Sequence, residues 1–231
     1  MSFSLQQKIK EIRSSIVAVG YSPGQNQINI SGSGFCISDD GKILTSAHVY
    51  NQTPPQFQNK MMAMVMNKQD PNGLEHYIWL SIFFIKKDDQ TDVALFQIEN
   101  YQSTLLKKME LGDSEKVEVG EDTYFIGFPY AAQLIKDGMG ITLVVNKAIV
   151  SNIKQDGVNP SHPRNFIIVD AISNPGNSGC PLIDIETNKV IGIMSVAFRI
   201  KSQVSEFEKL DIREPMHIAG ARPINLAKSI L

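Results

Sequence analysis

The sequence predicts an all-β protein built from antiparallel strands that close as barrels or pack as a sandwich. Its 231 residues contain roughly a dozen short apolar runs, rich in Val, Ile, Phe and Thr, which clusters of turn residues separate. Helical spacing of apolar residues occurs only near the two ends. With 42% apolar and 20% charged residues, the composition is that of an ordinary globular protein.

The first element is expected to be a helix over Leu5–Ile16, where apolar residues recur at helical spacing. Between the first strands, Asp40 and Gly41 predict a hairpin because both tolerate the positive φ of a tight turn. The last residues, 223–231, open with Pro and predict a terminal helix. The expected strands are Ser15–Gly20, Ile28–Ser38, Lys42–Ser46, Lys60–Met66, Ile78–Lys86, Val93–Glu99, Thr123–Gly127, Ile141–Ile153, Phe166–Val169, Pro181–Asp184, Val190–Phe198 and Met216–Ala219.

Charge and hydropathy exclude several classes of protein. The net charge of −2 gives no electrostatic reason to expect nucleic acid or an acidic membrane as a partner. The most apolar run, Tyr77–Ile85, is far shorter than the roughly 20 residues that span a bilayer. The polar N-terminus does not resemble a secretory signal, and two cysteines, Cys36 and Cys180, suit a reducing compartment. These observations predict a cytoplasmic protein.

The most informative segment is the loop Asn174–Leu182, in which glycines flank Ser178. A serine on such a tight turn exposes its hydroxyl and allows backbone N–H groups to converge beside it. A nucleophile for acyl transfer and its oxyanion hole need this arrangement. The alternative for this segment alone is a turn in which Gly, Pro and Asn serve only the backbone.

Two further residues suggest the partners of such a nucleophile. His48 follows an apolar strand and small residues, so its ring is expected to project from the strand end into a cleft. Asp92 stands at the start of the run Val93–Ile98. Taken singly, the histidine suits a structural role and the aspartate suits a turn. Together with Ser178 they form a set that these separate explanations do not account for.

The segments around His48, Asp92 and Ser178, in this order, resemble the trypsin-like serine peptidases, most closely the HtrA type. Further similar segments are Leu111-Gly112-Asp113-Ser114, Ile126-Gly127-Phe128-Pro129, Val169-Asp170-Ala171, Val190-Ile191-Gly192-Ile193 and Arg222-Pro223-Ile224-Asn225. The resemblance implies two antiparallel six-stranded β-barrels with short N- and C-terminal helices. It implies a single peptidase domain over 1–231, with barrels at 15–105 and 116–222 and a terminal helix at 223–231. A PDZ domain is not expected.

The resemblance also implies a mechanism. Ser178 would attack the scissile carbonyl, His48 would take its proton, and Asp92 would orient His48. The oxyanion hole would lie at Gly176, Asn177 and Ser178. No cofactor is expected. No metal is expected either, since the histidines outside this set lack ligand spacing: His76, His162 and His217.

The substrate pocket is expected to be small and apolar, favouring residues such as Ala, Val or Leu before the cut. By their positions relative to Ser178, the pocket residues are Ile172 and Ser173 at the base and Ser195, Val196, Ala197 and Ala219 on the walls. No acidic residue lies at that base to pair with a substrate Lys or Arg. Met194 occupies the position of the histidine that reads glutamate in glutamyl endopeptidases, which disfavours acidic specificity.

The loop departs from the digestive enzymes of the family at two positions. Asn177 replaces the aspartate that pairs with a newly cleaved N-terminus, so no N-terminal processing is expected. Cys180 replaces a second glycine and is a rival nucleophile, disfavoured because Ser178 occupies the matching position. The segment Arg199–Arg213 lengthens a loop beside the pocket and is either a solvated loop or an element that docks a regulatory protein partner.

Three functions follow from this pattern. The first is a serine endopeptidase that acts on a protein or peptide substrate. The second is a catalytically silent module that binds a protein or peptide partner through the same cleft, and the complete Ser-His-Asp set counts against it. The third is an ester hydrolase, which would use the same nucleophile.

Overall fold

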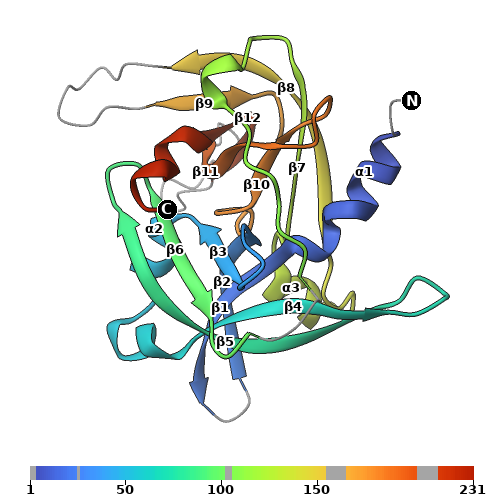
Figure 1. Cartoon of the computed structure of the whole chain (residues 1–231), viewed down its shortest axis with the longest axis vertical. Helices are drawn as coiled ribbons and strands as arrows, with labels where there is room; N and C mark the ends of the chain where they lie inside the picture. Colours follow the sequence, from blue (N-terminus) through green and yellow to red (C-terminus); the bar gives the residue numbers. More distant parts are fainter. Residues whose placement is uncertain (1–3, 25–26, 102–105, 155–164, 202–212) are drawn as a thin grey trace.

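The chain folds into two closed six-stranded barrels, as predicted (Figure 1). The computed structural model describes residues 4–24, 27–101, 106–154, 165–201 and 213–231. In the first barrel the strands follow the order β1-β2-β3-β6-β5-β4, and in the second β10-β11-β12-β9-β8-β7. Every pair of neighbouring strands is antiparallel.

All predicted strands are present, with ends that differ by a few residues. The first barrel consists of β1 (Ile16–Gly24), β2 (Gln27–Cys36), β3 (Lys42–Thr45), β4 (Met61–Gln69), β5 (Glu75–Asp88) and β6 (Val93–Ile98). The second consists of β7 (Asp122–Gly127), β8 (Val144–Lys154), β9 (Phe166–Val169), β10 (Pro181–Asp184), β11 (Val190–Lys201) and β12 (Arg213–Pro223).

Continuous apolar runs arise because several strands are buried on both faces. In β1, Val17 and Val19 point into the first barrel, whereas Ile16 and Ala18 point toward the second. Successive side chains of a strand lie on opposite faces, so both sets of residues must be apolar here. The same alternation places Phe125 inside the second barrel and Ile126 between the barrels.

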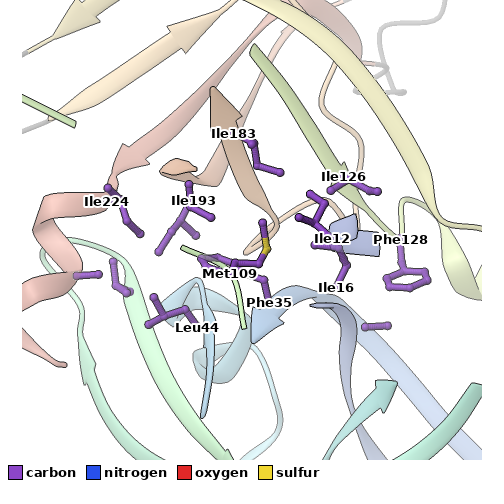
Figure 2. Packing of buried hydrophobic residues seen from close by; sticks show 14 of the residues in the cluster. Ile12, Ile16, Phe35, Leu44, Met109, Ile126, Phe128, Ile183, Ile193 and Ile224 are labelled. Carbon is purple, nitrogen blue, oxygen red and sulfur yellow. The ribbon is translucent and has the colours of Figure 1, made fainter. Parts of the chain in front are cut away.

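The inter-barrel cluster is a hydrophobic core to which both barrels contribute (Figure 2). Phe35 and Leu44 come from the first barrel, and Ile183 and Ile193 come from the second. Met109, from the segment that joins the barrels, packs among them. Burying an apolar side chain of this size stabilises a fold by about 1.5–3 kcal/mol, so this cluster fixes the barrels against each other.

The helices differ from the prediction in the middle of the chain and at its C-terminal end. The helix expected over Leu5–Ile16 is present as α1 (Leu5–Ile12), which ends one turn earlier. Ser4 and Gln7 form a capping box at its start, which was not predicted. The short 3-10 helices are η1 (Arg13–Ser15), η2 (Pro55–Lys60), η3 (Ser114–Lys116) and, at the C-terminal end where an ordinary helix was expected, η4 (Ile224–Ser229). Two unpredicted helices are α2 (Ala47–Asn51) and α3 (Ala131–Lys136). Helices of five or six residues are too short to display a helical period.

Helix α1 attaches to the second barrel through a buried lysine. Lys8 Nζ donates to the carbonyl oxygens of Ile185 and Glu186, in the turn after β10. Ile12 of the same helix packs in the inter-barrel cluster. The N-terminal helix therefore stabilises the turn from which β11 starts.

Candidate active site

His48 and Asp92 are brought together at the start of α2. Asp92 Oδ2 lies 2.8 Å from His48 Nδ1, and Oδ1 accepts the His48 backbone N–H at 2.9 Å. Ser46 is the N-cap residue, but its side chain makes no capping hydrogen bond. The carboxylate of Asp92 therefore caps the helix with one oxygen and orients the imidazole with the other.

The position of His48 corrects the prediction from the sequence. The strand expected to reach Ser46 ends at Thr45, and the histidine lies in a helix rather than at a strand end. The Ala47 N–H donates to the Asp92 backbone oxygen at 3.1 Å, which ties the helix to the loop before β6. Asp92 adopts a φ of 55°, a conformation that Asp tolerates better than most residues.

Asp92 has a third partner in the second barrel. Ser195 Oγ donates to Asp92 Oδ2 at 2.5 Å. Burial of the carboxyl would raise its pKa, but the hydrogen bond and charge of His48 and the bonds from Ser195 and the His48 N–H lower the pKa below its ordinary value. The carboxylate is therefore ionised at neutral pH and can stabilise a protonated imidazole.

The loop of Ser178 lies against the first barrel. The Ser33 N–H donates to the Ser178 carbonyl oxygen at 2.8 Å. Gly179 lies so close to Thr45 and Ser33 that a Cβ atom would overlap both, and its φ of 87° favours glycine. The Ser178 loop therefore lies beside the residues that lead into α2, the helix that contains His48.

No hydrogen bond joins the Ser178 hydroxyl to the His48 ring in the described structure. Among the described residues, neither the Ser178 hydroxyl nor His48 Nε2 has a hydrogen-bond partner. In enzymes without substrate, bonds between nucleophile and base are often long and tighten when the substrate binds. The structure therefore joins His48 to Asp92 and places the Ser178 loop beside α2, with the third contact open.

Two backbone N–H groups in the loop are free to bind an anion. Within the described part of the chain, no acceptor bonds the N–H of Gly176 or of Ser178. The carbonyls on the far side of these peptide groups are anchored: Pro175 O accepts the Tyr130 N–H at 2.7 Å, and Asn177 O accepts the Cys180 N–H at 3.0 Å. Both N–H groups therefore point away from these anchors.

Asn177 differs from its expected place in the oxyanion hole. Its N–H donates to Asn174 O at 3.0 Å and is not available to a substrate. Its side chain is fully buried, and neither polar atom of the amide has a partner among the described residues. The Asn177 side chain is thus buried without an ion pair among the described residues.

The residues expected to line the pocket have different surroundings. Ile172, Val196 and Ala197 are partly exposed, whereas Ser173 is buried. Ala219 has no exposed surface because it packs inside the second barrel, which corrects its assignment as a wall. Ser195 directs its hydroxyl to Asp92 instead of to a substrate.

Two cavities of the described structure lie away from these residues. One, of about 720 Å³, lies between the segment that joins the barrels and the β10–β11 turn, and includes Gly112, Lys116 and Glu186. The other, of about 360 Å³, lies along β4 and β5. Neither includes a predicted site residue.

Cys180 is surrounded by apolar side chains of the second barrel and is fully buried. Burial raises the pKa of its thiol far above the ordinary value, so the thiolate needed for attack is not formed. This disfavours Cys180 as the nucleophile. Cys36 is also buried and free.

The described residues contain no group of three or more His, Cys, Asp and Glu side chains that could hold a metal ion. His76 pairs with Asp70 near the tip of the β4–β5 hairpin, and His217 is exposed on β12. Helices in the described ranges are all too short to cross a bilayer. His162 and most of the segment Arg199–Arg213 lie outside the described residues.

The sequence did not identify three residues that hold the site together: Ser33, Ser46 and Tyr130. Ser46 Oγ donates to Met194 O at 3.1 Å, and the same oxygen accepts the Gly179 N–H at 2.7 Å. Ser33 lies between two glycines, Gly32 and Gly34. Small residues there allow the strand to approach the loop, since a Cβ on Gly32 would lie 2.8 Å from Ser178 O.

Comparison with known proteins relates this chain to a family. The family described as "Trypsin-like peptidase domain" matches residues 32–193. A "Probable periplasmic serine endoprotease DegP-like" of Pseudomonas putida (strain GB-1) is 33% identical over 174 residues, which are 75% of this chain and 31% of that protein. A "Probable serine protease do-like" of Buchnera aphidicola subsp. Acyrthosiphon pisum is 33% identical over 163 residues, covering 70% and 29%.

A similar fold occurs in a solved structure. The "HtrA-type protease AlgW with tripeptide" has a TM-score of 0.68 and 23% sequence identity, covering 99% of this chain and 62% of that one. The chain spans about a third of the length of the curated relatives that it matches.

The expected cytoplasmic location is wrong by this comparison, because several relatives are named as periplasmic enzymes. That expectation depended on the first residues and on two cysteines. The cysteines are buried and free, a state that does not distinguish between compartments. The match over 32–193, together with the two barrels, shows that the chain belongs to the trypsin-like peptidase domain family.

Proposed function

We propose that this chain is a serine endopeptidase in which Ser178 is the nucleophile, His48 the general base and Asp92 the residue that orients His48. The observation that carries the proposal is the 2.8 Å contact between His48 Nδ1 and Asp92 Oδ2, beside the Ser178 loop. We further propose that 1–231 acts as one peptidase domain, with halves at 15–105 and 116–222 and a terminal segment at 223–231.

The reaction begins when Ser178 Oγ attacks the carbonyl carbon of the scissile peptide. His48 Nε2 accepts the hydroxyl proton, and the ionised Asp92 stabilises the imidazolium that forms. The proton then passes from His48 to the leaving amine, and an acyl-enzyme remains on Ser178. His48 then accepts a proton from water, which attacks the acyl carbon. The ester bond to Ser178 Oγ breaks, His48 returns the proton to this oxygen, and the acid is released.

The N–H groups of Gly176 and Ser178 bind the oxyanion of each tetrahedral intermediate. Their orientation is supported by the anchored carbonyls of Pro175 and Asn177. Removal of one oxyanion-hole donor typically lowers kcat by about 10²–10³. Because Asn177 N–H is bonded to Asn174 O, the proposal gives Asn177 no donor role and keeps Gly176 and Ser178.

The substrate is proposed to be a protein or peptide with a small or apolar residue before the cut. Ile172, Val196 and Ala197 carry no charge and retain exposed surface, so they suit such a side chain. A peptide library tests this preference. A profile dominated by Arg, Lys or Glu before the cut would contradict it, as would a profile without any preference at that position.

A fluorophosphonate probe tests the mechanism, because it phosphonylates an activated serine. The wild-type protein should be labelled at Ser178, and the Ser178→Ala variant should not be labelled. Cys180→Ser serves as the control and should still react at Ser178, since the thiol is buried in the second barrel. Folded wild-type protein that is not labelled between pH 6 and 9 would refute the proposal.

The second candidate is a catalytically silent module that binds peptides. The observation that favours it is the open contact between Ser178 and His48 in the described structure. The two functions are separated by the same labelling experiment combined with peptide binding. A protein that binds peptides in the cleft but does not react with the probe is the silent module.

A further inference from the structure

Ser33 lies on β2, on the face that points toward the second barrel, and is completely buried. All of its polar atoms are engaged near the proposed nucleophile. Its N–H donates to Ser178 O at 2.8 Å, and its carbonyl oxygen accepts the Thr45 hydroxyl at 2.7 Å. Its side chain is the only one of these groups that a substitution can remove without changing the backbone.

The hydroxyl of Ser33 bridges two segments of the second barrel. It donates to Gly176 O at 2.6 Å and accepts the Phe128 N–H at 2.9 Å. Both distances are those of good hydrogen bonds, and one hydroxyl can make both because it is a donor as well as an acceptor. A residue of the first barrel therefore fixes the orientation of a peptide group in the Ser178 loop.

The direction of the Gly176 N–H depends on the peptide groups on both sides of this residue. The preceding carbonyl, of Pro175, is held by the Tyr130 N–H, and the following carbonyl, of Gly176 itself, is held by Ser33. Gly176 has a φ of 100°. Glycine reaches other backbone conformations at similar cost, so the residue does not hold this geometry by itself. The flanking hydrogen bonds must hold it.

We propose that Ser33 is a positioning residue whose hydroxyl keeps the Gly176 N–H directed at the oxyanion. This rests on the proposed function, since an oxyanion forms only if Ser178 attacks a carbonyl. Without the hydroxyl, the carbonyl of the Gly176–Asn177 peptide group loses its partner. The group then keeps only the bond from its N–H to Asn174 O, so it can tilt and change the backbone angles of Gly176. The Gly176 N–H then leaves the hole in part of the molecules, and the barrier to acylation rises.

The test is the Ser33→Ala variant, measured against wild type with a peptide substrate from the library profile. Loss of a hole donor acts on the transition state, so kcat should fall by about 10- to 1,000-fold while KM changes by less than about threefold. Fluorophosphonate labelling should slow by a similar factor. Thr123→Val is the matched control, because it removes a buried hydroxyl that donates to Ala148 O in the second barrel. Its kcat should stay within about threefold of wild type.

A kcat of Ser33→Ala equal to that of the control, or a change in KM alone, overturns the positioning role. If the alanine variant does not fold, Ser33→Cys is the second test of the positioning role. Its thiol fills the space of the hydroxyl but is a weak donor, so this variant should show the same loss of kcat. Failure of both variants to fold would make Ser33 a folding residue and also overturn the proposal. Wild-type protein that is not labelled refutes the proposed function instead, so the two failures are distinguishable.

Discussion

Replacing Asp92 with Asn should lower kcat by about 10⁴-fold and leave KM nearly unchanged. Asn is the informative substitution because it tolerates the φ of 55°, so the backbone is not strained. The carboxylate now accepts bonds from His48 N–H, His48 Nδ1 and Ser195 Oγ. An amide has a single oxygen and cannot satisfy all three.

The magnitude follows from the two orientations of the amide. If the amide oxygen faces the His48 N–H, the amide NH₂ group donates to Nδ1. The ring proton then resides on Nε2, where His48 cannot accept the proton of the nucleophile. With its oxygen toward Nδ1, the cap of α2 is lost, at about 1 kcal/mol. Either way the imidazolium loses an anion, which is worth about 4 kcal/mol at 4 Å and an effective dielectric constant of 20. That loss alone corresponds to about 10³ in rate, and the wrong tautomer of His48 lowers the rate further, to about 10⁴.

The assay is steady-state hydrolysis of a peptide, with folding checked by thermal unfolding. Asp89→Asn is the control, because Asp89 lies in the same loop and pairs with Lys87 at the surface. It should keep kcat within about threefold of wild type. If Asp92→Asn retained more than a tenth of the wild-type kcat, the assigned role of the His48–Asp92 contact would be refuted.

Three further predictions concern the surroundings of the site. Ser195→Ala removes a hydrogen bond that lowers the pKa of Asp92, so this pKa should rise. A carboxyl with a lowered pKa stabilises the folded protein, and this stability is lost as pH falls. Tm measured over a pH series should therefore show that the variant begins to unfold in acid at a higher pH than the wild type. Asn177→Asp buries a carboxyl without a partner and raises its pKa, so Tm should fall as pH rises above about 4, whereas the wild type should show no such trend. Lys8→Met leaves two carbonyls unpaired at a cost of about 2–3 kcal/mol and should lower Tm by roughly 4–12 °C with little change in kcat; an unchanged Tm would contradict the anchoring of α1.

The strands could be predicted because the barrels bury both faces of several of them. Ile16–Val19 and Val93–Phe96 are continuous apolar runs for this reason, and each was recognised as a strand. The turn after β2 was equally predictable, because Gly41 adopts the positive φ that its sequence indicated. The residue types of the candidate triad could be identified from sequence order and a family resemblance.

The parts that could not be predicted depend on contacts between distant segments. Helix α2 has five residues and is capped by Asp92 rather than by its own N-cap side chain, so no local signal marks it. Ser195 was placed in the pocket by its position, although its hydroxyl contacts Asp92. Nothing in the sequence around Ser33 indicates that its hydroxyl reaches Gly176, a residue 143 positions away.

The site and the inter-barrel cluster share the strand β2, which links their energetics. Ser33 and Phe35 lie on the same face of this strand, one bonded to the Ser178 loop and the other packed between the barrels. A shift of one barrel against the other would therefore move the Ser33 hydroxyl relative to Gly176. Displacements near 1 Å at a reacting centre can cost about 10²-fold in rate, so in the proposed enzyme the packing of the cluster would affect the rate as well as the stability. The barrels must be rigidly joined because each supplies groups that the other holds in place.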